Sequence, residues 1–147
     1  MGDRVVTPAR TITEGDAALF ATLFGSWRWD HTEVESVEPT ASGGGIPYSF
    51  LTLAISSGLM FLAGERGIPI STIALWGVEK VRFVAPTMIG DTLHVESVVT
   101  QVTEVDRERG LLAMSNCVKN QRGEEVLTYI SKIIAGRRPA LREASHG

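Results

Sequence analysis

The side chains best suited to proton transfer lie in residues 26–45, a stretch whose composition is typical of a loop. His31 is the first candidate, because an imidazole titrates near neutral pH and can act as a general base or acid. The carboxylates of Asp30 and Glu33 flank it. A lone loop histidine is more often a surface or packing residue, so both interpretations of His31 stay open at this point.

The same loop holds groups that could contact a ligand. Trp27 and Trp29 either line a pocket or pack the loop on the core, and the second interpretation is slightly favoured. Residues 43–45 are three consecutive glycines, which indicates a backbone that bends sharply or approaches another group closely. Loops of this length in compact domains are often functional.

Backbone donors are expected immediately after the glycines. Pro47 suits the first turn of a helix, where its missing N–H costs nothing. The early N–H groups of such a helix lack intrahelical partners and direct a positive dipole at whatever lies before them. Ser49 would carry one of these groups, which serves either as an oxyanion donor or as part of an ordinary helix cap.

Other chemistries find little support in the sequence. The three histidines are far apart, and no pair has the spacing of metal ligands, so we predict no metal site. The one cysteine, Cys117, cannot form an internal disulfide and falls in an apparent strand, where a small buried thiol is expected. A formal net charge of -3 argues against nucleic-acid binding.

Two helices are expected to position the loop. The first runs from Thr13 to Phe24, with Thr13 as its cap and Asp16 at capping-box spacing. The second runs from about Pro47 to Glu65. Its apolar residues go most of the way round, which is typical of a buried helix, so other elements must wrap it.

The sequence after the second helix predicts strands at residues 72–84, 92–105, 111–118 and 125–135, separated by short polar turns. Such turns imply an antiparallel meander. We therefore expect one α+β domain over residues 1–147, with an antiparallel sheet of about five strands against the second helix and a flexible tail at 138–147.

The longest apolar stretch, residues 50–63, is too short to span a bilayer, and no secretory signal is visible, so a soluble cytoplasmic protein is expected.

Four stretches of the chain, taken together, resemble the MaoC-like dehydratases, a family that includes R-specific enoyl-CoA hydratases. The fold that this resemblance implies is the hotdog fold, a long antiparallel sheet wrapped around a central apolar helix. The stretches are Thr13-Ile-Thr-Glu, Phe24 to Glu33, Gly44 to Leu51, and Val81-Arg-Phe-Val-Ala-Pro86 followed by Gly90-Asp-Thr-Leu93.

The chain departs from the family pattern at the expected catalytic segment. The family motif Gly-Asp-x-Asn-Pro-x-His is matched by Gly25 and His31, but Ser26 replaces its aspartate. Arg28 and Trp29 replace its asparagine and proline. Where the family usually has Ala-His-Gly at the start of the central helix, this chain has Pro47-Tyr48-Ser49.

The resemblance implies a site for hydrating an enoyl thioester. His31 would be the base, Ser26 would hold the water by hydrogen bonds, and the Ser49 N–H would occupy the position of the family's oxyanion-hole glycine. Because Ser26 cannot act as a carboxylate, Asp30 or Glu33 is a possible replacement acid. Substrate contacts are assigned to Tyr48, Gly45, Trp27 and Trp29.

Three functions follow from these residues. The first is a hydratase or dehydratase acting on an acyl thioester of coenzyme A or of acyl carrier protein, with no cofactor. The second is a degenerate, non-catalytic hotdog subunit that binds acyl thioesters, which the loss of the motif aspartate favours. The third is a hotdog thioesterase, for which Glu38 and Glu65 are poorly placed. The expected assembly is a homodimer or larger homo-oligomer, with no nucleic-acid or membrane partner.

Overall fold

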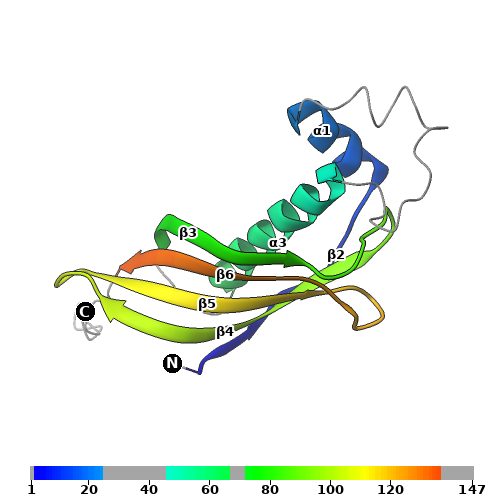
Figure 1. Cartoon of the computed structure of the whole chain (residues 1–147). Helices are drawn as coiled ribbons and strands as arrows, with labels where there is room; N and C mark the ends of the chain where they lie inside the picture. Colours follow the sequence, from blue (N-terminus) through cyan, green and yellow to red (C-terminus); the bar gives the residue numbers. More distant parts are fainter. Residues whose placement is uncertain (1, 25–45, 67–71, 137–147) are drawn as a thin grey trace, which may run out of the picture.

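The computed structural model describes residues 2–24, 46–66 and 72–136, the side chains of residues 46–48 and 63–66 excepted. It consists of a curved antiparallel sheet with a long helix lying across one face (Figure 1). A shorter helix sits over the start of the long one. In chain order the elements are β1 (Arg4–Val6), β2 (Arg10–Thr11), α1 (Glu14–Phe24), α3 (Ile46–Arg66), β3 (Thr72–Phe83), β4 (Thr92–Glu104), β5 (Arg109–Lys119) and β6 (Glu125–Gly136).

The sheet has six strands rather than about five, in the order β1-β4-β5-β6-β3, with β2 also paired to β4. All pairings are antiparallel, as the short turns predicted. The two strands that sequence analysis missed are β1 and β2, which have only 3 and 2 residues and so show no alternation. The four predicted strands and both helices are confirmed, with bounds shifted by one or two residues.

The predicted capping box at the start of α1 is present. The Asp16 N–H donates to Oγ1 of Thr13 at 3.0 Å, and the Thr13 N–H donates back to Oδ2 of Asp16 at 2.9 Å. These bonds satisfy donors that the first turn of a helix otherwise leaves unpaired. They fix where α1 begins, and α1 ends at Phe24 as predicted.

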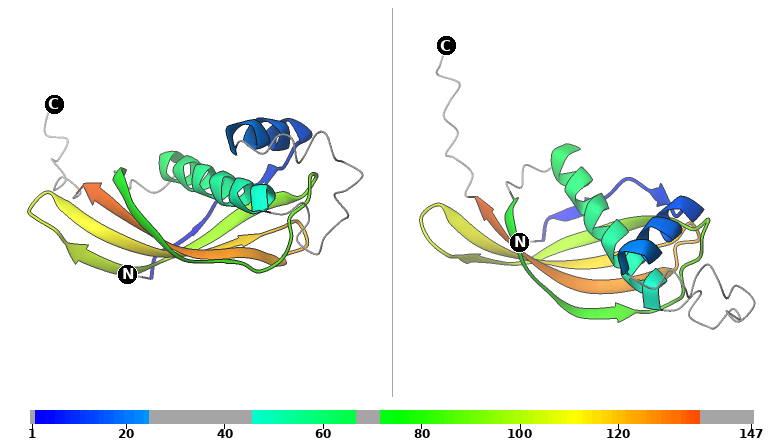
Figure 2. Two further views of the ribbon diagram at one scale, coloured as in Figure 1. Left: turned by 45° about the horizontal axis from the view of Figure 1, so that its top comes forward. Right: turned by 90° about the horizontal axis from the view of Figure 1, so that it is seen from above.

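The core lies between α3 and the inner face of the sheet (Figure 2). Leu51, Ile55 and Leu59 recur at intervals of four along α3 and are buried. They pack with the inward side chains of β4, β5 and β6, among them Leu93, Val95, Val118, Val126 and Leu127. The sheet therefore covers one side of the helix, as the hotdog prediction requires.

The opposite side of α3 does not meet the expectation of burial all round. Phe50 and Phe61 are 44% and 62% exposed. A single curved sheet reaches round only part of a helix about 10 Å across. The apolarity of this second side therefore has no explanation in the sheet.

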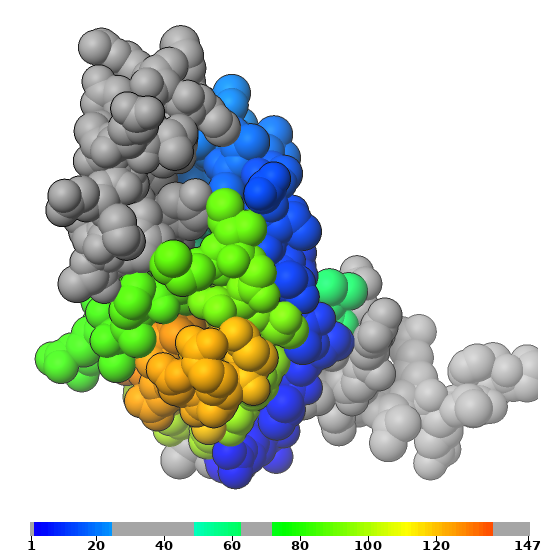
Figure 3. Space-filling model, turned by 90° about the vertical axis from the view of Figure 1, so that its right-hand side faces the viewer, coloured from blue at the N-terminus to red at the C-terminus, as the bar shows by residue number. Residues whose placement is uncertain are grey.

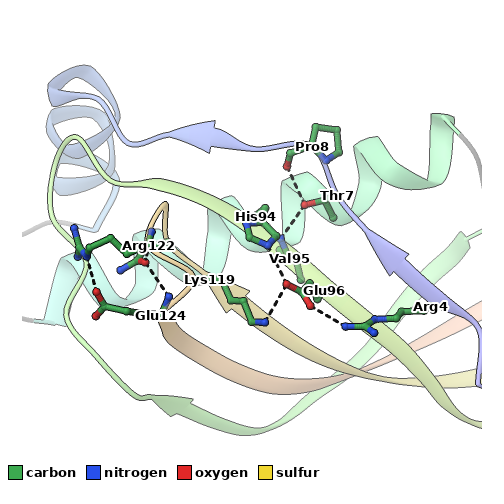
Figure 4. A network of polar contacts seen from close by, with 10 residues as sticks. Arg4, Thr7, Pro8, His94, Val95, Glu96, Lys119, Arg122 and Glu124 are labelled. Carbon is green, nitrogen blue, oxygen red and sulfur yellow. Dashed lines mark hydrogen bonds and ion pairs between the residues drawn. The ribbon is translucent and has the colours of Figure 1, made fainter.

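The outer face of the sheet carries a polar network centred on Glu96 (Figure 4). The carboxylate of Glu96 contacts Arg4 on β1 at 2.9 Å, and both His94 on β4 and Lys119 on β5 at 3.1 Å. His94 lies on the face of β4 opposite the buried Leu93 and Val95. The network joins the three-residue strand β1 to the body of the sheet.

These contacts lower the pKa of Glu96 from its ordinary 4.5 to about 2, chiefly through the hydrogen bond with His94 and then that with Lys119. A carboxyl whose pKa is depressed on folding stabilises the protein above its unfolded pKa. That contribution is lost as the pH falls from about 4.5 towards 2.

Replacing Glu96 with glutamine should lower the free energy of unfolding at pH 7 by less than about 1 kcal/mol, the usual limit for solvent-screened pairs. It should also flatten the loss of stability between pH 4.5 and 2. Urea unfolding across this pH range measures both effects. Glu124→Gln is the control, because Glu124 pairs only with the exposed Arg122 among the contacts described. An unchanged pH slope in Glu96→Gln would contradict the assignment.

Candidate active site at the start of the central helix

The first turn of α3 supplies backbone donors at one end of the molecule. Ser49 lies in this turn and is half-buried. The N–H groups of the first three residues of an α-helix have no acceptor within the helix, so those of Ile46 and Tyr48, immediately before Ser49, are available to an oxygen atom outside it. The helix dipole adds positive potential at the same place. The local arrangement can therefore stabilise developing negative charge on a carbonyl oxygen.

A row of phenylalanine rings borders this turn. Phe20 and Phe24 of α1 stack at 5.9 Å between ring centroids, and Phe24 and Phe50 of α3 at 5.8 Å. The Phe50 ring meets the edge of Phe83, the last residue of β3, at 6.2 Å. Phe24, Phe50 and Phe83 each keep more than two fifths of their surface exposed. The donors of α3 thus lie beside an apolar surface contributed by three elements.

A groove of about 370 Å³ runs between α1 and α3. Its lining is mostly apolar, and its polar part includes the ion pair of Arg10 with Asp16, whose N–O distance is 2.6 Å. Such a groove suits an apolar chain better than a charged one. The apolar residues that line it are Leu19, Phe20, Leu23, Leu51, Ala54, Ile55, Leu59 and Leu62.

The β3–β4 turn lies at the same end of the molecule and is held firmly. The Met88 N–H donates to the Asp91 carboxylate at 2.9 Å, and the Gly90 N–H donates to the Ile12 carbonyl at 2.8 Å. Gln121 in the β5–β6 turn donates from Nε2 to Oδ1 of Asp91 at 2.9 Å. Figure 3 views this end, with the β5–β6 turn in orange beside the β3–β4 turn in green. The turn is therefore a fixed point against which α3 can be positioned.

Two hydroxyl pairs join α3 to its surroundings inside the apolar core. Thr52 and Thr87 share a hydrogen bond of 2.6 Å between their hydroxyl oxygens, and Thr87 belongs to the β3–β4 turn. One helical turn later, Ser56 and Tyr129 of β6 share a bond of 2.5 Å. All four side chains are buried. Burying a hydroxyl group costs free energy unless it is hydrogen-bonded, so each member of a pair offsets the cost of burying the other. The two bonds also have a preferred direction, which the apolar contacts around them lack.

A third contact extends the row along α3. The Ser97 hydroxyl on β4 lies 3.1 Å from the Met60 sulfur and donates to Oδ1 of Asn116 at 2.5 Å. The Asn116 amide in turn donates to the Ser131 hydroxyl at 2.9 Å. Thr52, Ser56 and Met60 are spaced by four residues, so they lie on one side of the helix. We call Thr52, Ser56 and Met60, with their partners Thr87, Tyr129 and Ser97, the polar row.

Two titrating groups of the sheet, Cys117 and Tyr129, are held in their neutral forms. Burial raises the pKa of Tyr129 despite hydrogen bonds from the Ser56 and Ser57 hydroxyls, which act in the opposite direction. Burial, followed by contact with Glu125, raises the pKa of Cys117 to about 11. Cys117 is half-buried rather than fully buried, because it lies on the outer face of β5. A thiol with this pKa is a poor nucleophile at neutral pH.

The predicted site residues are only partly within the described chain. Ser49 lies in the first turn of α3, as expected, and Tyr48 precedes it in the same turn, although its side chain is not described. The other predicted residues lie outside the described residues, and their roles stay predictions. They are Ser26, Trp27, Trp29, Asp30, His31, Glu33 and Gly45.

Sequence analysis missed the phenylalanine row and the polar row. Phe20 and Phe24 have helical spacing, but nothing in the sequence indicates that Phe50 and Phe83 join them. The hydroxyls of Thr52 and Ser56 did carry a signal, since they recur at an interval of four within an otherwise apolar helix. Their partners could not be identified without the fold.

Two further observations concern only the part of the chain that the structure describes. Within it, no group of three or more histidine, cysteine, aspartate or glutamate side chains is arranged to hold a metal ion. None of the helices in these ranges is long and apolar enough to cross a membrane.

The sequence profile of the MaoC-like domain matches residues 1–120 of the chain. The chain therefore belongs to the family of MaoC-like domains, whose members include hydratases and dehydratases. Beta-methylmalyl-CoA dehydratase from Chloroflexus aurantiacus is 31% identical over 141 residues, which is 94% of this chain and 39% of that protein. The chain spans 27% to 39% of the length of the first curated relatives that it matches.

Solved structures agree with this assignment. The MaoC-like dehydratase from Rhodospirillum rubrum superposes with a TM-score of 0.77 and 28% identity, covering 95% of this chain and 94% of that one. A conserved hypothetical protein from Mycobacterium tuberculosis, described as a double hotdog fold, superposes at 0.67 with 18% identity, covering 95% of this chain and 43% of that one. The fold of this chain is the hotdog fold.

The Ser56–Tyr129 bond can be tested by a double-mutant cycle. Tyr129→Phe should cost about 1–3 kcal/mol of unfolding free energy, because it leaves a buried hydroxyl without this partner. The double variant Tyr129→Phe/Ser56→Ala should lose less unfolding free energy than the sum of the two single variants, since Ser56→Ala removes the unpaired hydroxyl. Urea unfolding of the four proteins gives the coupling energy. Additivity within about 0.5 kcal/mol would contradict the pairing.

Proposed function

We propose that the chain adds water to an enoyl thioester or removes water from a 3-hydroxyacyl thioester. In the hydration direction, water gives its hydroxyl to the β-carbon of the double bond and a proton is added at the α-carbon. The reaction needs a base for the water and donors for the charge that develops on the thioester oxygen. The substrate is carried on coenzyme A or on acyl carrier protein, and the proposal requires no cofactor.

The residue assignments follow the family resemblance and belong to the proposal. His31 takes the proton from water, and Ser26 orients that water, with Asp30 or Glu33 as a possible supporting acid. The Ser49 N–H and the N–H groups before it in the first turn of α3 donate to the thioester oxygen. The substrate is contacted by Tyr48, Gly45, Trp27 and Trp29, and the half-exposed rings of Phe50 and Phe83 provide a further apolar surface beside Ser49.

The observation that carries the proposal is the likeness to beta-methylmalyl-CoA dehydratase along 94% of the chain. A dehydratase of a CoA thioester needs the oxygen-stabilising donors that the start of α3 can offer. The second candidate, a non-catalytic subunit that binds acyl thioesters, is favoured by one sequence observation, the serine at position 26 in place of the family's aspartate.

We also propose that the chain assembles as a homodimer through β3. This strand is an edge of the sheet, and Ile73, Leu75 and Trp76 on it are 55%, 58% and 61% exposed. An exposed apolar edge strand can pair with another chain through its unpaired backbone groups. A second copy would cover both the edge and these side chains.

Light scattering at micromolar concentration should therefore give twice the chain mass of 15.9 kDa. Leu75→Lys should shift the population towards monomer, because a charge would have to be buried at the interface. Val98→Lys is the matched control: Val98 is 36% exposed on β4, which pairs there with both β1 and β5 and so is not an edge of the sheet at this point. A monomeric parent protein, or equal effects of the two changes, would count against pairing through β3.

The activity is tested by following the hydration of crotonyl-CoA and of a longer enoyl-CoA by absorbance. His31→Ala should lower the rate by roughly 10²–10⁴-fold, the usual effect of losing a general base. The melting temperature should hardly change, because a loop base contributes little to core packing. His94→Ala is the control, since His94 lies on the outer face of β4, and it should keep the rate.

Ser26→Asp separates the two candidate functions. An inactive parent protein that gains hydratase rate would indicate a degenerate site on an intact scaffold. An active parent protein that loses rate would indicate a site rebuilt around serine, with Asp30 or Glu33 in support. If the parent protein and both the His31→Ala and Ser26→Asp variants fail on several enoyl thioesters, the hydratase proposal is wrong and the binding subunit replaces it.

A further inference from the structure

The start of α3 needs a fixed orientation if its N–H groups are to stabilise charge on a substrate oxygen. Catalysis by such donors depends on their being held where the charge develops, and small displacements are costly. Apolar burial attracts without direction, so the contacts of Leu51, Ile55 and Leu59 with the sheet permit the helix to rotate or slide slightly. A hydrogen bond has a preferred length and angle and removes this freedom.

The contact of the polar row that is nearest to the start of α3 is the Thr52–Thr87 pair. Thr52 follows Ser49 by three residues, which corresponds to about 4.5 Å along the helix axis. Its partner Thr87 belongs to the turn that Asp91 and Ile12 hold in place. The start of α3 is therefore tied to the β3–β4 turn through two threonines that are 2% and 5% exposed.

We propose that Thr52 and Thr87 are positioning residues, which hold the start of α3 so that its backbone N–H groups meet the thioester oxygen. The inference rests on the proposed hydratase function and adds to it two residues outside the catalytic loop. Neither hydroxyl contacts the substrate in this account. Both act through the placement of the helix.

The chain offers a way to separate positioning from stability. Replacing both threonines with valine keeps the shape of the pair and removes both polar groups together, so neither is left unpaired in the core. The Thr52→Val/Thr87→Val protein should therefore melt within a few degrees of the parent protein. A matched control is Thr11→Val/Thr92→Val, which removes a similar hydroxyl pair, 2.8 Å apart, between β2 and β4.

In steady-state hydration of crotonyl-CoA, the Thr52→Val/Thr87→Val protein should lose roughly ten- to a hundredfold in kcat, with a smaller change in KM. The Thr52→Ser/Thr87→Ser protein, which keeps both hydroxyls, should recover most of the rate, and the control pair should stay within about twofold of the parent. The proposal is overturned if the valine pair keeps its kcat, or if its kcat falls only in step with its melting temperature.

A second readout does not depend on activity. In an NMR spectrum of ¹⁵N-labelled protein, the Ser49 amide signal should move in the Thr52→Val/Thr87→Val protein and stay in place in the control. If the parent protein hydrates no enoyl thioester, the proposed function fails, and the Ser49 signal alone decides whether the pair positions α3. An unmoved signal in the valine pair would overturn the positioning role in either case.

Discussion

The contact between α3 and the inner face of the sheet is the constraint on which the other features of the molecule depend. Leu51, Ile55 and Leu59 supply the burial that holds the two layers together. The polar row then fixes where along the sheet, and at which rotation, the helix lies. Burial alone gives stability, whereas a donor site at the end of a helix also needs the defined position that hydrogen bonds provide.

The position of α3 has two consequences, one for the start of the helix and one for the side that faces away from the sheet. The first turn of α3 comes to lie beside Phe50 and Phe83, so a polarising group and an apolar surface share one end of the fold. The other side of the helix is left with exposed apolar residues such as Phe61, which one sheet cannot reach. The same helix therefore carries backbone donors at its start and an exposed apolar surface farther along.

Much of the fold could be predicted because its signals are local. The Thr13–Asp16 capping box and the turns between strands depend on residues close in sequence. The strands β1 and β2 could not be predicted, because 3 and 2 residues are too few to show the alternation of apolar and polar residues. The pairing of Thr52 with Thr87, or of Ser56 with Tyr129, joins distant parts of the chain. The polar residues could therefore be recognised in the sequence, but their hydrogen-bond partners could not. The roles of His31 and Ser26 rest on the family resemblance alone.

The central claim is that the start of α3 polarises the carbonyl of a bound thioester. Infrared spectroscopy of the protein with butyryl-CoA labelled with ¹³C at the carbonyl tests it directly, because this saturated thioester binds without reacting. Hydrogen bonds to the oxygen weaken the C=O bond, so the labelled band should move to lower wavenumber on binding. A band that stays at its free position while the protein is saturated with ligand would contradict the account.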